Sequence, residues 1–346
     1  MEILAAIFYA VFGAAALIAG GETLVRGAKK IAAKMKISPL VVGLTVVAIC
    51  TSAPEMAVSF SAALQATPEN PGVADVALGN VVGSNICNVF LILGVCALIR
   101  PLSASRQMVR RENPIMIAVC CLPLILAALC VRPDGAHCLP RWSGALLLTL
   151  FVLYEFWTVK QAKRDEAAAN GEKSAATDVS ENEPTAARTR SAALDWIFAL
   201  GAVALGLALL VVGAKFFVGG AVTIARAVGV SELVIGLTLV ALGTSLPELT
   251  VSAIATLRGE TDVALGNVVG SNICNILLIL GGTVLLVSGG IGISARSLYV
   301  DLPIMLGAAA LCGWFCFTGH KIQRWEGAVF VAAQLAYSVY LTQFAA

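Results

Sequence analysis

The chain has 346 residues and a formal net charge of +2; 59% of its residues are hydrophobic and only 13% are charged. That charged share is about half of what soluble domains usually carry. A soluble core cannot absorb this much apolar surface but lipid can, so composition excludes a soluble globular domain and favours an integral membrane protein. The two His and the scattered Cys residues show no zinc-binding spacing, and the small net charge gives no sign of nucleic-acid binding.

Apolar segments follow one another along the chain. A membrane-spanning helix needs about 20 apolar residues, and this rule predicts helices at roughly 3–25, 38–64, 76–99, 114–131, 142–159, 195–220, 231–257, 262–288, 299–318 and 325–343. The first and the sixth can continue through Ala33 and Ala227, which would make both helices long and tilted. The predicted fold class is therefore all-α and polytopic, with ten transmembrane helices.

One hydrophilic stretch, at about 160–190, interrupts this series. It is rich in Ala, Glu, Lys, Ser and Thr and poor in large apolar residues, a composition typical of a flexible linker. It divides the chain into a five-helix unit at 1–159, a linker at 160–192 and a second five-helix unit at 193–346.

Basic residues gather in every second connection between the predicted helices. With the N-terminus outside, the inner connections hold 18 of the 23 Lys and Arg residues: Arg26, Lys29, Lys30, Lys34, Lys36, Arg100, Arg106, Arg110, Arg111, Lys160, Lys163, Arg164, Lys173, Arg188, Arg190, Arg258, Lys321 and Arg324. Because basic residues favour the cytoplasmic side, this predicts a cytoplasmic linker and both termini outside.

The two halves carry the same motifs. Residues 51–55 (Thr-Ser-Ala-Pro-Glu) align with 244–248 (Thr-Ser-Leu-Pro-Glu) at an offset of 193, and residues 75–88 are identical to 262–275. Since each half has an odd number of helices, the second copy must enter the membrane from the opposite face. Inverted repeats of this kind are typical of secondary transporters, which place their binding site near the membrane midplane.

Glu55 and Glu248 lie deep inside apolar segments that contain no Lys or Arg. A carboxylate at that depth costs several kcal/mol unless it is protonated or paired. A protonated, purely structural Glu is the simpler alternative at one position. Two Glu residues at equivalent positions of an inverted repeat favour a cation site instead.

Oxygen-bearing groups surround both Glu residues. Pro54 and Pro247 lack an N–H, which frees a backbone carbonyl one turn earlier, although a simple packing kink is the alternative. Hydroxyls precede each Glu on the same helix face, at Thr51, Ser52, Thr244 and Ser245. The next helix of each half carries polar residues spaced i, i+4, i+8: Asn80, Ser84 and Asn88, then Asn267, Ser271 and Asn275. Some of these amides, Asn80 and Asn267 in particular, are expected only to join helices.

The candidate ligands are therefore all oxygens, which suit hard cations such as Ca²⁺ and Na⁺; Ca²⁺ takes about 6–8 of them. A site charge of −2 matches one Ca²⁺ or two to three Na⁺ ions, but not both together, and such competition is a physical basis for exchange. An intramembrane enzyme would need a nucleophile or metal ligands that the motifs lack. A passive channel fits a central pair of carboxylates less well than an alternating site does.

Four other ionisable residues stand out. Glu22 and Lys215 occupy the same position in the two halves, and snorkelling to a membrane interface is the simpler interpretation of both. Glu112 and Asp301 each precede a helix-starting Pro within two residues, which is typical of acids stabilised at a helix N-terminus.

With its two copies of Thr-Ser-x-Pro-Glu and of Gly-Asn-x-x-Gly-Ser-Asn, the chain resembles the sodium/calcium exchanger family of the calcium/cation antiporter superfamily, specifically its bacterial members. The resemblance covers the whole chain. It implies a non-enzymatic antiporter of a bacterial or archaeal plasma (inner) membrane that needs no cofactor and works as a monomer. The partners implied are the lipid bilayer and the transported cations, with no nucleic acid.

The resemblance also assigns ion ligands. The central ones fall on Glu55, Asn88, Glu248 and Asn275; the flanking oxygens fall on Thr51, Ser52, Ser84, Thr244, Ser245 and Ser271, with the backbone carbonyls of Ala48 and Ala241. It further implies that the long first and sixth helices slide against the rest. Two departures are Cys50, where a Gly is usual, and Asn275, where some relatives carry Asp. The predicted function is Na⁺-driven exchange of Ca²⁺, with H⁺/Ca²⁺ exchange and K⁺-dependent Na⁺/Ca²⁺ exchange as alternatives.

Overall fold

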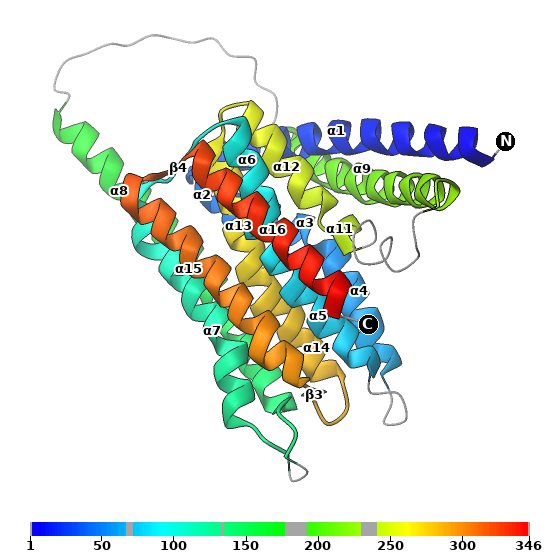
Figure 1. Ribbon diagram of the computed structural model, residues 1–346. Helices are drawn as coiled ribbons and strands as arrows, with labels where there is room; N and C mark the ends of the chain where they lie inside the picture. The colour runs from blue at the N-terminus through cyan, green and yellow to red at the C-terminus, as the bar shows by residue number, and fades with distance from the viewer. Residues whose placement is uncertain (1, 67–71, 133–134, 177–191, 230–240, 345–346) are drawn as a thin grey trace.

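The computed structural model describes residues 2–66, 72–132, 135–176, 192–229 and 241–344 as a bundle of tilted helices (Figure 1). In the first half the elements are α1 (Glu2–Met35), α2 (Pro39–Val42), η1 (Gly43–Val47), α3 (Ala48–Thr51), α4 (Ala53–Gln65), α5 (Gly72–Cys87), η2 (Asn88–Leu93), α6 (Gly94–Ile99), β1 (Leu102–Ser103), η3 (Met108–Glu112), α7 (Asn113–Leu129), β2 (Cys138–Leu139) and α8 (Arg141–Ala176). The η elements are π-helical segments.

The second half repeats this order. Its elements are α9 (Ala192–Ala227), α11 (Ala241–Gly243), α12 (Leu246–Leu257), α13 (Thr261–Cys274), η5 (Asn275–Leu280), α14 (Gly281–Leu286), β3 (Ile291–Gly292), η6 (Ser297–Asp301), α15 (Leu302–Gly319), β4 (Lys321–Ile322) and α16 (Arg324–Phe344). The fold is thus almost entirely helical, as predicted, with four two-residue strands that the sequence analysis did not include.

Within the described residues, seven helices are long and apolar enough to cross a membrane. They match the first, third, fourth, fifth, sixth, eighth and ninth predicted segments. The second segment is a broken helix, with Pro39–Thr51 and Ala53–Gln65 bent by 46°, and it makes an eighth span if the two parts count as one. The seventh segment lies partly outside the described residues, and α16 covers the tenth without belonging to the seven.

The broken helix follows from its sequence. Pro54 stands in the first turn of α4, and Ser52 just before it has φ −78° and ψ 6°, outside the α-helical region. Ser245 takes nearly the same conformation, φ −88° and ψ 3°, before Pro247 of α12. A proline has no N–H for the carbonyl four residues earlier, so each helix stops and restarts one turn ahead of its Glu.

The first and sixth predicted helices are long, as expected: α1 runs beyond Ala33 to Met35, and α9 runs to Ala227. They lie side by side across one end of the bundle (Figure 1). Each of the two helices carries small residues at seven-residue intervals, and these residues face the other helix. A methyl group added at Gly20 would lie 2.9 Å from the carbonyl oxygen of Gly206, so the two backbones are nearly in contact.

A helix extends into the predicted linker. Helix α8 does not stop at 159 but continues to Ala176, so the first part of the predicted linker is helical. Its Ala, Lys, Glu and Gln residues have high helix propensity. At the start of this extension, Gln161 donates a 2.9 Å hydrogen bond to Asp165, and Arg111 of η3 contacts the same carboxylate at 3.2 Å. Residues 177–191 lie outside the described part of the chain.

Two strand pairs join the halves reciprocally. Strand β1 of the first half pairs antiparallel with β4 of the second, and β2 of the first half pairs antiparallel with β3 of the second. In each half the earlier strand follows the helix that carries the Asn motif. Figure 1 shows β4 near the end of the bundle that α1 crosses and β3 near the opposite end.

The middle of the bundle is formed by the two helices that carry the Asn motif. Of the most apolar stretch of Thr261–Leu286, 89% of the residues are buried, and for Val76–Ile99 the share is 72%, against 28% for α1. These two helices therefore place their polar side chains at the centre of the molecule, away from lipid.

Candidate ion-binding site

Glu55 and Glu248 lie in the first turns of α4 and α12, and each is only 1% exposed. Ser245 Oγ donates a 3.1 Å hydrogen bond to Glu55 Oε1, and Ser52 Oγ donates a 3.1 Å hydrogen bond to Glu248 Oε1. Each carboxylate is thus held by a serine of the opposite half. The structure brings the two predicted half-sites together across the chain's repeat.

The remaining oxygen of each carboxylate is the most informative feature of this site. Glu55 Oε2 and Glu248 Oε2 are buried and receive no hydrogen bond from any described residue, and neither Glu forms an ion pair within the described part of the chain. Four further buried oxygens are unpaired in the same way: Asn88 Oδ1, Asn275 Oδ1, Ser271 Oγ and Thr244 Oγ1. Buried polar atoms are normally hydrogen-bonded, so six unpaired oxygens on the predicted ligand residues require an explanation.

The other predicted ligands are Ser84 and the backbone carbonyls of Ala48 and Ala241. Ser84 is buried, and Ser245 Oγ lies 3.5 Å from its hydroxyl oxygen. The carbonyl of Ala48 already accepts from Thr51 Oγ1 at 3.3 Å and from the amide of Ser52 at 3.0 Å. Ala241 is the first residue of α11, so its backbone stands at the edge of the described residues.

Two residues beside the site escaped the sequence analysis. Asn85 and Asn272 are both 1% exposed and hydrogen-bond to the predicted ligands Asn275 and Asn88. They are not members of the i, i+4, i+8 rows, although each stands three residues before the last member of its row, and were therefore not selected. Their presence in both copies of Gly-Ser-Asn was the signal that could have found them.

Asn80 and Asn267 have the joining role expected of them. Asn80 Nδ2 donates to the carbonyl of Glu55 (3.2 Å) and to Ser59 Oγ (2.9 Å). Asn267 Nδ2 makes the equivalent contacts to the carbonyl of Glu248 (3.4 Å) and to Ser252 Oγ (3.0 Å). These amides tie each Glu-bearing helix to the Asn-motif helix of its own half.

The two halves are not in the same conformation. Thr51 is fully buried and donates to Asn267 Oδ1 at 3.0 Å, whereas Thr244 is half-buried and its hydroxyl has no partner among the described residues. Gly266 is buried, and a methyl group added to it would lie 2.7 Å from the carbonyl oxygen of Leu40, while the equivalent Gly79 is exposed. The site is therefore covered where α2 and η1 pack on α13, and the segment of the second half equivalent to α2 and η1 lies outside the described residues.

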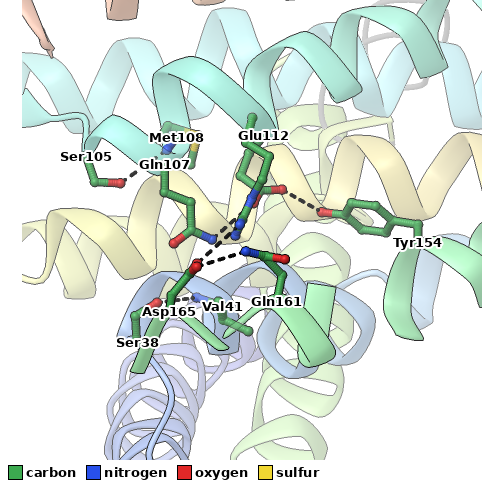
Figure 2. A network of polar contacts seen from close by, with 10 residues as sticks. Ser38, Val41, Ser105, Gln107, Met108, Glu112, Tyr154, Gln161 and Asp165 are labelled. Atoms are coloured by element: carbon green, nitrogen blue, oxygen red, sulfur yellow. Dashed lines mark hydrogen bonds and ion pairs between the residues drawn. The ribbon is translucent and has the colours of Figure 1, made fainter. Parts of the chain in front are cut away.

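Glu112 shows by contrast what a structural buried acid looks like (Figure 2). It directly precedes α7, as predicted, and is fully buried. Gln107 Nε2 and Arg111 Nε donate to its Oε1 at 3.1 and 2.9 Å, and the Tyr154 hydroxyl donates to its Oε2 at 3.2 Å. Both oxygens and the charge are satisfied by protein, so no ion is needed here.

The second half contains a smaller version of the same arrangement. Asp301 precedes α15, accepts a 3.1 Å hydrogen bond from the Tyr337 hydroxyl and has Arg296 Nε at 3.8 Å. Neither acid is available as an ion ligand in the way that Glu55 and Glu248 are.

Known proteins share both halves of this chain. The family model described as sodium/calcium exchanger protein matches residues 5–160 and 198–343. The chain is 38% identical over 344 residues to the putative antiporter CaxA of Alkalimonas amylolytica, an alignment that covers 98% of this chain and 99% of that protein. It is 34% identical over 341 residues to the sodium/calcium exchanger MaX1 of Methanosarcina acetivorans, covering 94% and 95% of the two chains.

The fold is also similar to a solved structure. The sodium-calcium exchanger NCX_Mj superposes with a TM-score of 0.76 at 32% sequence identity, over 98% of this chain and 99% of that chain. The similarity therefore extends over both halves rather than over one of them.

Proposed function

The chain belongs to the sodium/calcium exchanger family, and on this basis we propose that it is a secondary active antiporter that exchanges Na⁺ for Ca²⁺ across a membrane. The proposal rests on the two buried carboxylates and their contacts with the opposite half. Glu55 and Glu248 are each held by a serine of the opposite half and each keep one oxygen without a donor among the described residues. A bound cation would remove the free-energy cost of those unpaired, buried oxygens.

The proposed ion ligands come from both halves. They are the side chains of Glu55, Glu248, Asn88, Asn275, Thr51, Ser52, Ser84, Thr244, Ser245 and Ser271, with the backbone carbonyls of Ala48 and Ala241. All of them are oxygens, and Ca²⁺ binds about 6–8 oxygen ligands. The two carboxylates balance one Ca²⁺ or two to three Na⁺ ions, so the two kinds of ion compete for the same charge and exchange for one another.

Alternating access would follow from an inverted repeat of five helices in each half. Three observations support this. The reciprocal strand pairs β1–β4 and β2–β3 lie toward opposite ends of the bundle. The hydrogen bonds of Glu55 recur at Glu248 with the halves exchanged. Gly79 is exposed while its equivalent Gly266 is buried, so these two positions of the repeat differ in exposure.

The remaining features of the proposal follow from the family and from charge placement. The protein would lie in a bacterial or archaeal plasma membrane with both termini outside, act as a monomer and need no cofactor. With Asn rather than Asp at position 275, the two Glu residues alone set the site's charge.

Calcium uptake into sealed liposomes tests the coupling ion. Purified protein is reconstituted, the liposomes are loaded with Na⁺ and diluted into Na⁺-free buffer with ⁴⁵Ca²⁺, and uptake is compared with liposomes loaded with choline. We expect uptake only with the outward Na⁺ gradient. Uptake that follows a pH gradient and ignores Na⁺ would replace the proposal by H⁺/Ca²⁺ exchange, and an absolute requirement for K⁺ would indicate the K⁺-dependent form.

A further inference from the structure

Four asparagines from the two halves form a reciprocal set of hydrogen bonds at the centre of the bundle. Asn88 Nδ2 donates to Asn272 Oδ1 at 3.0 Å, and Asn275 Nδ2 donates to Asn85 Oδ1 at 3.0 Å. We infer that Asn85 and Asn272 are positioning residues: they hold the amide nitrogens of Asn275 and Asn88 so that the carbonyl oxygens of these two residues face the ion. The inference rests on the proposed function and adds two residues to its site.

The orientation of Asn85 and Asn272 is itself determined by backbone groups. Asn85 Nδ2 donates to the backbone carbonyl of Asn272 at 3.2 Å, and Asn272 Nδ2 donates to the backbone carbonyl of Asn85 at 3.4 Å. A backbone carbonyl can only accept, so each side-chain nitrogen must point toward it and each side-chain oxygen away from it. Sulfur atoms lie beside the same nitrogens, Met305 Sδ at 3.6 Å and Met116 Sδ at 3.7 Å.

The orientation of Asn85 in turn fixes the orientation of Asn275 at the site. Because Asn85 presents its oxygen to Asn275, Asn275 must present its nitrogen to Asn85, and its own oxygen is then left facing elsewhere. That oxygen, Asn275 Oδ1, is one of the buried atoms without a partner among the described residues, and so is Asn88 Oδ1. The backbone of each half thus sets, through an asparagine of the opposite half, which atom its own ligand residue turns toward the ion.

The arrangement also explains why an amide suits position 275. A carboxylate there would place an oxygen against Asn85 Oδ1, and two acceptors 3.0 Å apart with no proton between them repel each other. Asn85 cannot simply turn over, because its nitrogen would then leave the carbonyl of Asn272. Asn85 therefore acts as a selectivity residue that favours a neutral ligand at position 275 and keeps the site charge at −2.

The helix geometry makes these contacts reciprocal. Asn85 and Asn88 are three residues apart and share a helix face, as do Asn272 and Asn275. In each half the α-helix changes to a π-helical segment at the last of these residues. Segments of this kind often occur at functional sites because they change the direction of the following side chains.

Calcium-dependent thermal stabilisation of the purified protein tests the inference. We expect Asn85→Ala and Asn272→Ala to raise the Ca²⁺ concentration of half-maximal stabilisation about tenfold or more, since each leaves a ligand amide without its orienting partner. Asn113→Ala is the matched control, because Asn113 is equally buried but lies in α7, where its side chain hydrogen-bonds to none of the described site residues. Its Ca²⁺ midpoint should equal that of the wild type.

A double variant separates positioning from general destabilisation. If Asn85 acts through Asn275, then adding Asn85→Ala to Asn275→Ala should not weaken Ca²⁺ binding further. Additive effects, or a wild-type Ca²⁺ midpoint in a folded Asn85→Ala variant, would overturn the inference. Should the Ala variants not fold, Asn85→Ser keeps a hydroxyl for the carbonyl of Asn272 but is too short to reach Asn275, and the same midpoint shift is expected.

The same measurement distinguishes the two proposals. No Ca²⁺ stabilisation in the wild type would remove the proposed function and the positioning role together. Stabilisation of the wild type with an unchanged midpoint in Asn85→Ala, Asn85→Ser and Asn272→Ala would remove only the positioning role. Na⁺-driven Ca²⁺ uptake by the wild-type protein in liposomes tests the proposed function without using any of these variants.

Discussion

At the residue scale, two kinds of buried acid coexist in this protein. Glu112 accepts three hydrogen bonds, one of them from the Arg111 guanidinium, so protein groups balance its charge. Glu55 and Glu248 each accept a hydrogen bond from a neutral serine, and neither pairs with a cationic side chain in the described part of the chain. Burial alone does not separate a structural acid from a ligand; the number and charge of the donors do.

This difference predicts opposite responses to neutralisation. Glu55→Gln or Glu248→Gln should abolish Ca²⁺ uptake and Ca²⁺ stabilisation without lowering the Ca²⁺-free Tm, because it removes a buried charge that has no cationic partner. Glu112→Gln should lower the Ca²⁺-free Tm, since it removes the buried one of the two carboxylates that pair with Arg111 and leaves only the more exposed Asp165, at a cost of about 2 kcal/mol. Thermal unfolding in detergent with and without Ca²⁺ measures both. Wild-type uptake in either Glu-to-Gln site variant would remove those residues from the site.

At the element scale, the sequence predicted which helices contact one another at the site, but it did not predict the details of those contacts. The repeated motif identified Glu55, Glu248, Asn88 and Asn275, because a polar residue inside an apolar segment is conspicuous without any structure. Asn85 was missed because it directly follows Ser84 and so falls outside the i, i+4, i+8 row that the sequence analysis followed. The strand pairs and the continuation of α8 to Ala176 depend on contacts between distant segments, which helix periodicity does not report.

The α1–α9 pair gives an element-scale prediction. Gly20 faces the backbone of α9, and an added methyl group would lie 2.9 Å from the Gly206 carbonyl oxygen. Gly20→Val should therefore force the helices apart and destabilise the fold by about 1–3 kcal/mol, with a lower Tm and slower Ca²⁺ uptake. Gly201→Val, at an exposed position of α9 with open space around it, is the control and should resemble the wild type. Equal Tm values for the two variants would contradict close packing at Gly20.

At the scale of the whole molecule, α1 packs on α12 of the second half, whereas the described part of α9 makes no comparable contact with α4 of the first half. A methyl group added at Gly21 of α1 would meet Ile254 and Thr250 of α12, and Glu22 pairs with Arg258 at 2.8 Å. The offset of 193 maps these α12 residues onto Ala57, Ser61 and Gln65 of α4. Those three are exposed and line an open groove together with Val58, Ala62 and Val76.

This asymmetry suggests how the paired ionisable residues of α1 and α9 differ in role. If the halves exchange conformations during the proposed transport cycle, Ala214 of α9 takes the place of Gly21 and approaches Ser61. Lys215, the counterpart of Glu22, would then face the uncharged Gln65. The ion pair between Glu22 and Arg258 would therefore be specific to the conformation described here. Because both partners are partly exposed, solvent screening keeps its contribution to that conformation small.

The groove on α4 tests whether the halves exchange in this way. Ser61→Trp fills the space that α9 would need, so it should slow Ca²⁺ uptake at least about fivefold, the factor for a clash of roughly 1 kcal/mol. Ca²⁺ stabilisation in detergent should stay at the wild-type midpoint, because the site is complete in the conformation that has the groove open. Leu64→Trp adds the same side chain at a 72% exposed position of α4 that does not line the groove, and should transport normally. Wild-type uptake by Ser61→Trp would mean that α9 never enters this groove, and that the two halves change access without exchanging their contacts with α1 and α9.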